Sequence, residues 1–126
     1  MIRPEVKWID WVEEFTGSVD EPDFLLVTAG IGERGSEGAD NFSVNVCNVA
    51  GLNAMLDGKS GLWPRGMLIV AKIEPNHVEK ALQNLANQFS GSKNWSIFAE
   101  RLNRYLRWEF EDTDDYQGEP GIPQID

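Results

Sequence analysis

The sequence predicts an α+β fold, in which a mainly antiparallel sheet of four to five strands carries two helices from the C-terminal half on one face. Two observations lead to this expectation. In the first half of the chain apolar residues alternate with polar ones, as in strands, whereas between positions 78 and 102 they recur every three or four residues, as in helices. The length of 126 residues suits one domain, which we place at residues 1–111.

The strands come first along the chain. Residues 6–10 alternate weakly after a proline. Residues 23–31 are apolar at both alternating sets of positions, which favours a strand buried on most of both faces. Residues 42–47 alternate cleanly, and the polar, glycine-rich residues 32–40 between the two predict an antiparallel hairpin with a mobile connection. A further apolar run covers residues 67–73.

The first of the two main helices is expected near residues 75–90. Pro75 suits the first helical position, because the N–H that proline lacks would be unpaired there. Apolar side chains then recur at helical spacing, and Gly91 can end the helix. A further short helix is expected at residues 49–56.

The second main helix is expected near residues 94–105, with Asn94 or Ser92 as its cap. Beyond it the pattern changes to a period of two, and we expect Trp108 and Phe110 to point inward. A short final strand is favoured there, although a continued helix is nearly as well supported. The predicted core consists of Leu25, Val27, Ile31, Val44, Val46, Ile69, Leu82, Leu85, Phe98 and Leu102.

Charge restricts the classes of partner. The chain has 11 Lys and Arg against 21 Asp and Glu, a net charge of −10, which disfavours binding to nucleic acid or to an anionic membrane. No apolar run is long enough to span a bilayer and no signal-peptide pattern is present, so a cytoplasmic location is expected. Residues 109–126 carry seven acids and no base, and residues 112–126 predict an extended acidic tail.

The residue types of common catalytic and metal sites are scarce. The single Cys47 excludes an internal disulfide and a cysteine-based zinc site, and is expected to be a buried, inert thiol. The single His77 has no apparent acid–base partner at helical spacing. Residues 58–60 lack the earlier glycine of a phosphate-binding loop, and residues 112–119 lack the glycine of a calcium loop. The sequence therefore predicts no cofactor, no metal and no enzyme.

Three stretches resemble one known family. Residues 30–47 contain Ile-Gly, a charged glycine-rich loop and a strand that ends in Val-Cys. Residues 66–70 are similar to the strand that follows in the family. The closing pattern has Trp95, Ala99-Glu100 and the Trp-Glu-Phe motif of residues 108–110. In this order the motifs, which cover residues 24–112, resemble the immunity protein 8 family of bacterial polymorphic toxin systems.

This resemblance implies a protein that binds one cognate toxin C-terminal domain and blocks it. Many such toxins are nucleases with basic grooves, and an acidic inhibitor would associate with them rapidly. Two other classes stay open: a general acidic adaptor or nucleic-acid mimic, and a carboxylate-dependent enzyme of unrecognised type. We expect the toxin-binding surface at the acidic residues Glu33, Glu37, Glu109, Glu111, Asp112, Asp114 and Asp115.

Overall fold

The computed structural model describes residues 1–17, 22–111 and 124–125 of the chain. The elements follow one another as β1 (Pro4–Gly17), β2 (Pro22–Glu33), β3 (Asp40–Cys47), α1 (Val49–Leu56), β4 (Gly61–Leu62), β5 (Met67–Ile69), α2 (Pro75–Gln88), α3 (Trp95–Leu102), β6 (Arg107–Trp108) and β7 (Gln124–Ile125). The predicted domain boundary and the extended tail stay predictions, because residues 112–123 and 126 lie outside the described residues.

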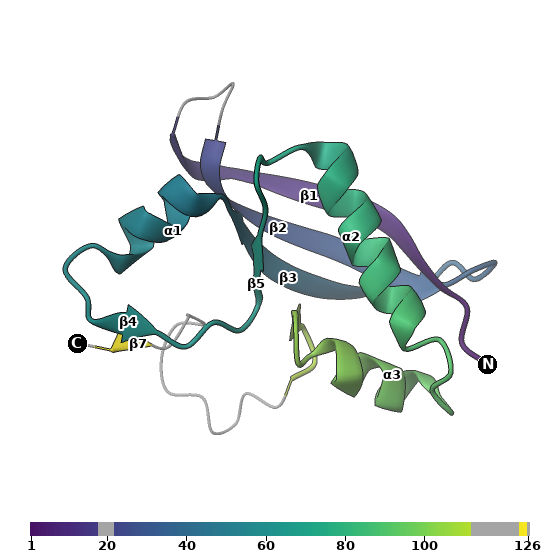
Figure 1. Cartoon of the computed structure of the whole chain (residues 1–126). Coiled ribbons are helices and arrows are strands. Elements are labelled where there is room, and N and C mark those ends of the chain that lie inside the picture. Colours follow the sequence, from purple (N-terminus) through teal and green to yellow (C-terminus); the bar gives the residue numbers. More distant parts are fainter. Residues whose placement is uncertain (18–21, 112–123, 126) are drawn as a thin grey trace.

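Five strands form the main sheet, in the order β1-β2-β3-β5, and β6 also pairs with β3. The β1–β2, β2–β3 and β3–β6 pairs are antiparallel, whereas β5 runs parallel to β3. Strands β4 and β7 form a separate antiparallel pair. Figure 1 shows α2 lying across the main sheet and α3 below β3. Buried side chains of both helices share one core with β2 and β3, and the sheet and helices together confirm the predicted α+β class.

The core lies between one face of the main sheet and the two helices. Val27 pairs with Val44 and Ala29 with Phe42 in the β2–β3 ladder, and all four side chains are fully buried. From the helices, the buried side chains are Val78, Leu82, Ala86, Phe98, Ala99 and Leu102. Eight of the ten predicted core residues are buried, and Leu85 is partly buried against the core.

Two apolar residues predicted to face inward do not. Ile69 is 50% exposed, because β5 is a three-residue edge strand whose neighbouring residue, Leu68, takes the core-facing position. Phe110 is 62% exposed, since β6 ends at Trp108 and the chain turns away there. Trp108 itself is half-buried and packs against the core, as predicted.

The expectation that residues 23–31 are buried on most of both faces is met fully on one face and in part on the other. Their second face carries Phe24, Leu26 and Thr28, and these side chains are only half-buried. The helices α2 and α3 pack against the first face, which carries Leu25, Val27, Ala29 and Ile31. The second face lacks this cover, so its side chains keep more solvent exposure than those of the first face.

The predicted start of α2 is confirmed, whereas its predicted end is wrong. Pro75 is the first residue of α2, but the helix ends at Gln88 with Phe89 as its C-cap, so Gly91 does not end it. Asn94, and not Ser92, caps α3, since its Oδ1 atom accepts a hydrogen bond of 2.9 Å from the Ile97 N–H. The chain after α3 forms the short strand β6 in place of a continued helix. None of the helices in the described ranges is both long and apolar enough to cross a membrane.

Strand β1 is longer than its weak sequence pattern indicates. It spans 14 residues, and its register with β2 shifts at three points, which blurs the alternation. Its outer edge is held by α2: the Val6 N–H donates to Gln83 Oε1 (2.9 Å), and Gln83 Nε2 donates to the Pro4 carbonyl (3.0 Å). These bonds occupy edge groups that could otherwise pair with another chain.

Candidate protein-binding site

Four of the predicted toxin-binding acids lie in described parts of the chain, two at the β2–β3 connection and two after β6. Glu33 ends β2 and Glu37 lies in the β2–β3 loop, whereas Glu109 and Glu111 follow β6. The Glu109 N–H donates to the Asn41 carbonyl (3.0 Å), which places this residue beside the start of β3, where the β2–β3 loop ends. The predicted site residues Asp112, Asp114 and Asp115 lie outside the described residues.

Asp40, the first residue of β3, joins three elements at this end. Its Oδ2 atom accepts hydrogen bonds from Trp95 Nε1 of α3 (2.7 Å) and from Trp108 Nε1 of β6 (3.0 Å). Hydrogen bonds to a charged carboxylate are stronger than neutral ones. One acid therefore fixes the position of two tryptophans beside the β2–β3 loop. The sequence places Asp40 in a polar loop and carries no signal for this role.

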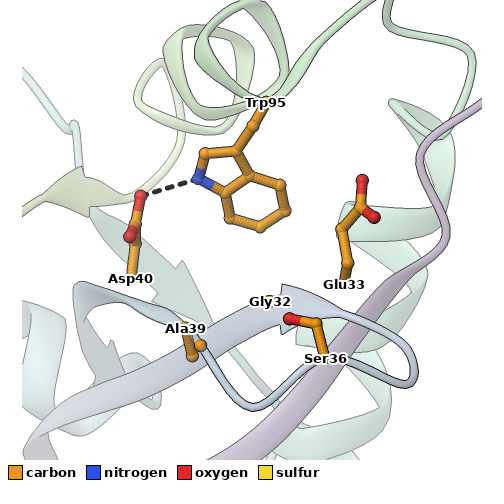
Figure 2. A pocket seen from close by; sticks show the side chains of 7 residues that line it. Gly32, Glu33, Ser36, Ala39, Asp40 and Trp95 are labelled. Carbon is orange, nitrogen blue, oxygen red and sulfur yellow. Dashed lines mark hydrogen bonds between the residues drawn. The ribbon is translucent and has the colours of Figure 1, made fainter.

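A pocket of about 300 Å³ lies next to this junction, lined by Gly32, Glu33, Ser36, Gly38, Ala39, Asp40 and Trp95. The loop can fold this closely over β2 because Gly32 has no side chain: a Cβ atom there would lie 2.1 Å from the Gly38 carbonyl oxygen. Figure 2 shows the Trp95 indole between the side chains of Asp40 and Glu33. An aromatic face flanked by carboxylates can accept a positively charged side chain.

The predicted acids differ in how far they are already engaged. The Glu109 carboxylate accepts the Asn41 N–H, and Glu111 Oε1 lies 3.0 Å from Arg65 Nη2. Glu33 and Glu37 are exposed and form no ion pair with another described residue. The side chains of Glu33 and Glu37 are thus available to a partner, whereas those of Glu109 and Glu111 already interact with groups of the chain.

The sheet face opposite α2 and α3 forms a second candidate surface, which we call the open face. The ladders place Trp8 beside Gly30, and they place Asp10, Thr28, Ser43 and Arg107 in the next row across β1, β2, β3 and β6. At one end of this face Cys47 is buried beside Gly51 of α1. A hollow of about 330 Å³ is lined by Leu26, Ser43, Asn45, Arg107, Trp108, Glu109 and Glu111.

Trp8 is the largest exposed side chain of the open face. It is 46% exposed, and its indole rests directly against the Gly30 backbone, where a Cβ atom would lie 2.0 Å from the ring. Sequence reasoning did not identify Trp8 or Asn45 as surface features of interest. The weak alternation of β1 was the available signal for Trp8, whereas the position of Asn45 depends on the pairing of β3 with distant strands.

The single histidine and the single cysteine of the chain lie on different elements, α2 and β3. His77 is exposed, and its Nδ1 atom lies 3.1 Å from Glu74 Oε2, so the expectation that it lacks an acidic partner is wrong. Cys47 is buried as predicted, and burial raises the pKa of its thiol. Within residues 1–17, 22–111 and 124–125, no three His, Cys, Asp or Glu side chains are grouped as a metal site would require.

The described chain thus combines an α+β fold with an acidic loop, an aromatic pocket and an open sheet face. The family model of immunity protein 8 matches residues 4–113, so the chain belongs to the immunity protein 8 family. The match includes β1, which lies before the resemblance seen in the sequence. No curated protein and no solved structure matches the chain. Immunity-protein families typically lack enzymatic activity, and membership implies neutralisation of a cognate toxin.

Proposed function

We propose that the chain neutralises one cognate toxin domain by direct binding in the cytoplasm, with no turnover of its own. The family match over residues 4–113 carries this proposal. The described surface supports it, because it includes an exposed tryptophan, an acidic loop and two hollows open to a partner. Such features suit recognition of a protein surface.

The partner is a basic domain, with a nuclease as the favoured class. Residues 70–106, which contain both main helices, carry three acids and five bases. In contrast, residues 1–17, 22–69 and 107–111, which contain the main sheet and its loops together with α1 and β4, carry eleven acids and six bases. The acid excess of the described chain is therefore on the sheet side. A basic toxin is attracted to that side and is disfavoured at the helices.

The expected contact residues are the predicted acids Glu33, Glu37, Glu109, Glu111, Asp112, Asp114 and Asp115. Within this set, Glu33 has the best-defined surroundings, since it lines the Trp95 pocket. An arginine or lysine of the toxin entering this pocket would meet the indole face of Trp95 and the carboxylate of Glu33.

The test is co-expression with the C-terminal toxin domain encoded by the adjacent gene. Cells should survive with the intact chain and die without it. The double variant Glu33→Lys/Glu37→Lys should fold but lose protection or bind at least about tenfold more weakly, since like charges would then face the toxin. The matched control Glu79→Lys/Glu100→Lys reverses two exposed acids of α2 and α3 and should protect fully.

Failure of the intact chain to protect against this toxin would contradict the proposed function. Full protection by the Glu33/Glu37 variant would contradict only the role of these two acids. Comparable binding of the intact chain to several unrelated basic proteins would favour the general acidic adaptor in place of a dedicated immunity protein.

A further inference from the structure

The open face has an uncharged middle and charged margins. Its middle is formed by small or neutral side chains, with Thr28 and Ser43 sharing a hydrogen bond of 3.2 Å between their hydroxyl groups. Leu26 and Asn45 line the hollow beside them. Charged groups stand at its margins, including Asp10 on β1 and the residues that follow β6. A neutral centre with a charged rim is the usual arrangement of a protein-binding surface.

Trp8 gives this face an aromatic group that is exposed and yet held in place. Its ring rests against Gly30, a position where even an alanine side chain would collide with it. A side chain that is already ordered loses little conformational entropy when a partner covers it. Tryptophan is also among the residue types most enriched where binding energy is concentrated.

The hollow offers a complementary recess on the same face. Its volume of about 330 Å³ is sufficient for a side chain of a partner. Ser43 and Asn45 provide polar groups, and Leu26 provides an apolar one. The charged side chains that line it are one base, Arg107, and two acids, Glu109 and Glu111. The charge distribution indicates which partner fits: the acid excess of the described chain is on the sheet and its loops, whereas the residues of the helix layer are net basic.

We propose that the cognate toxin domain docks on the open face, with Trp8 packed into the interface and one toxin side chain inserted into the hollow beside Asn45. This inference rests on the proposed function, and it adds a surface that the acidic residues alone do not define. The engaged acids Glu109 and Glu111 then form one rim of the docking surface, since both line the hollow. A second copy of this chain is disfavoured as the occupant, because two acid-rich sides would face each other.

The experiment measures binding of the full-length chain to the purified toxin domain encoded by the adjacent gene, by isothermal titration calorimetry. Three variants alter the open face: Trp8→Ala removes the aromatic group, Asp10→Lys reverses an exposed charge next to it, and Asn45→Arg fills the hollow and adds a positive charge. The matched control Asn84→Arg places the same side chain on an exposed position of α2. Circular dichroism and thermal unfolding verify that each variant is folded.

We expect Trp8→Ala and Asn45→Arg each to weaken binding by about 30-fold or more, the size of an interface hot spot, and Asp10→Lys by about tenfold. Asn84→Arg should stay within about threefold of the intact chain. If Trp8→Ala does not fold, binding by Asp10→Lys and Asn45→Arg tests the proposal instead. Asp10 is exposed and Asn45 is half-buried, so both changes should leave the fold intact.

Binding within threefold of the intact chain for the folded open-face variants would overturn this inference and leave the proposed function standing. If Asn84→Arg were the only variant to lose binding, the interface would lie on the helix side in place of the open face. A concentration-dependent dimer of the isolated chain that Trp8→Ala abolishes would also overturn it, in favour of a second copy as the occupant. No binding by the intact chain would instead contradict the proposed function.

Discussion

The Asp40 carboxylate provides a direct test of how this fold is held together at its candidate binding end. Replacing Asp40 with alanine removes the acceptor for two indole N–H groups, those of Trp95 and Trp108. The two donors belong to α3 and β6, which lie far from β3 in the sequence. The substitution therefore weakens long-range connections and leaves the local preferences of the strand nearly unchanged.

The expected loss follows from the two hydrogen bonds. A hydrogen bond to a charged group contributes about 1.5–3 kcal/mol. The three side chains are only half-buried, so water replaces part of this contribution when the carboxylate is removed. We expect Asp40→Ala to lower the free energy of unfolding by about 2–4 kcal/mol. Asp40→Asn keeps a neutral acceptor oxygen, and should cost about 1 kcal/mol.

Urea unfolding followed by tryptophan fluorescence measures these values. A double-mutant cycle that combines Asp40→Ala with Trp95→Phe or Trp108→Phe isolates each hydrogen bond, because phenylalanine lacks the N–H donor. The reasoning is refuted if Asp40→Ala changes stability by less than about 0.5 kcal/mol, or if both cycles give a coupling energy near zero.

Three further measurements test other parts of the structure. Trp108→Ala should destabilise the protein by about 3 kcal/mol through a cavity at the core, whereas Phe110→Ala should cost less than about 1 kcal/mol because that ring is mostly exposed. Gln83→Ala should cost about 1–2 kcal/mol by removing two bonds to the β1 edge, and an unchanged unfolding midpoint would contradict this. Cys47 should react with a thiol reagent only after unfolding. Because burial raises the folded pKa of Cys47, stability should fall as pH rises above the ordinary thiol pKa of about 8.5, and Cys47→Ala should remove that decline.

Elements with strong local signals were predictable from the sequence. The β2–β3 hairpin follows from two alternating segments, and α2 and α3 follow from helical spacing with Pro75 and Asn94 at their starts. These signals are local, because a strand or helix must present one apolar side to the core. The core residues of β2 and β3 were predictable for the same reason.

Features that depend on pairing between distant segments were not predictable. The parallel alignment of β5 with β3 leaves Ile69 exposed, and no nearby residue indicates this. The length of β1 is hidden by its register shifts. The same limitation applies to the candidate site. The acids of the β2–β3 loop are visible in the sequence, but the role of Asp40 and the open face around Trp8 arise only when separate strands come together.

Two contributions to toxin binding can be separated, because they arise from different parts of the chain. If the toxin docks as proposed, the predicted contacts Asp112, Asp114 and Asp115 would add charge, whereas Trp8 would add contact area on the open face. Changing the three aspartates to asparagine should slow association several-fold at low salt and weaken its dependence on ionic strength, with little effect on dissociation. Trp8→Ala should instead accelerate dissociation, because short-range packing is lost after the complex forms. Stopped-flow measurements at two salt concentrations distinguish the effects, and faster dissociation of the asparagine variant would show that these aspartates make close contacts and do not only attract the toxin.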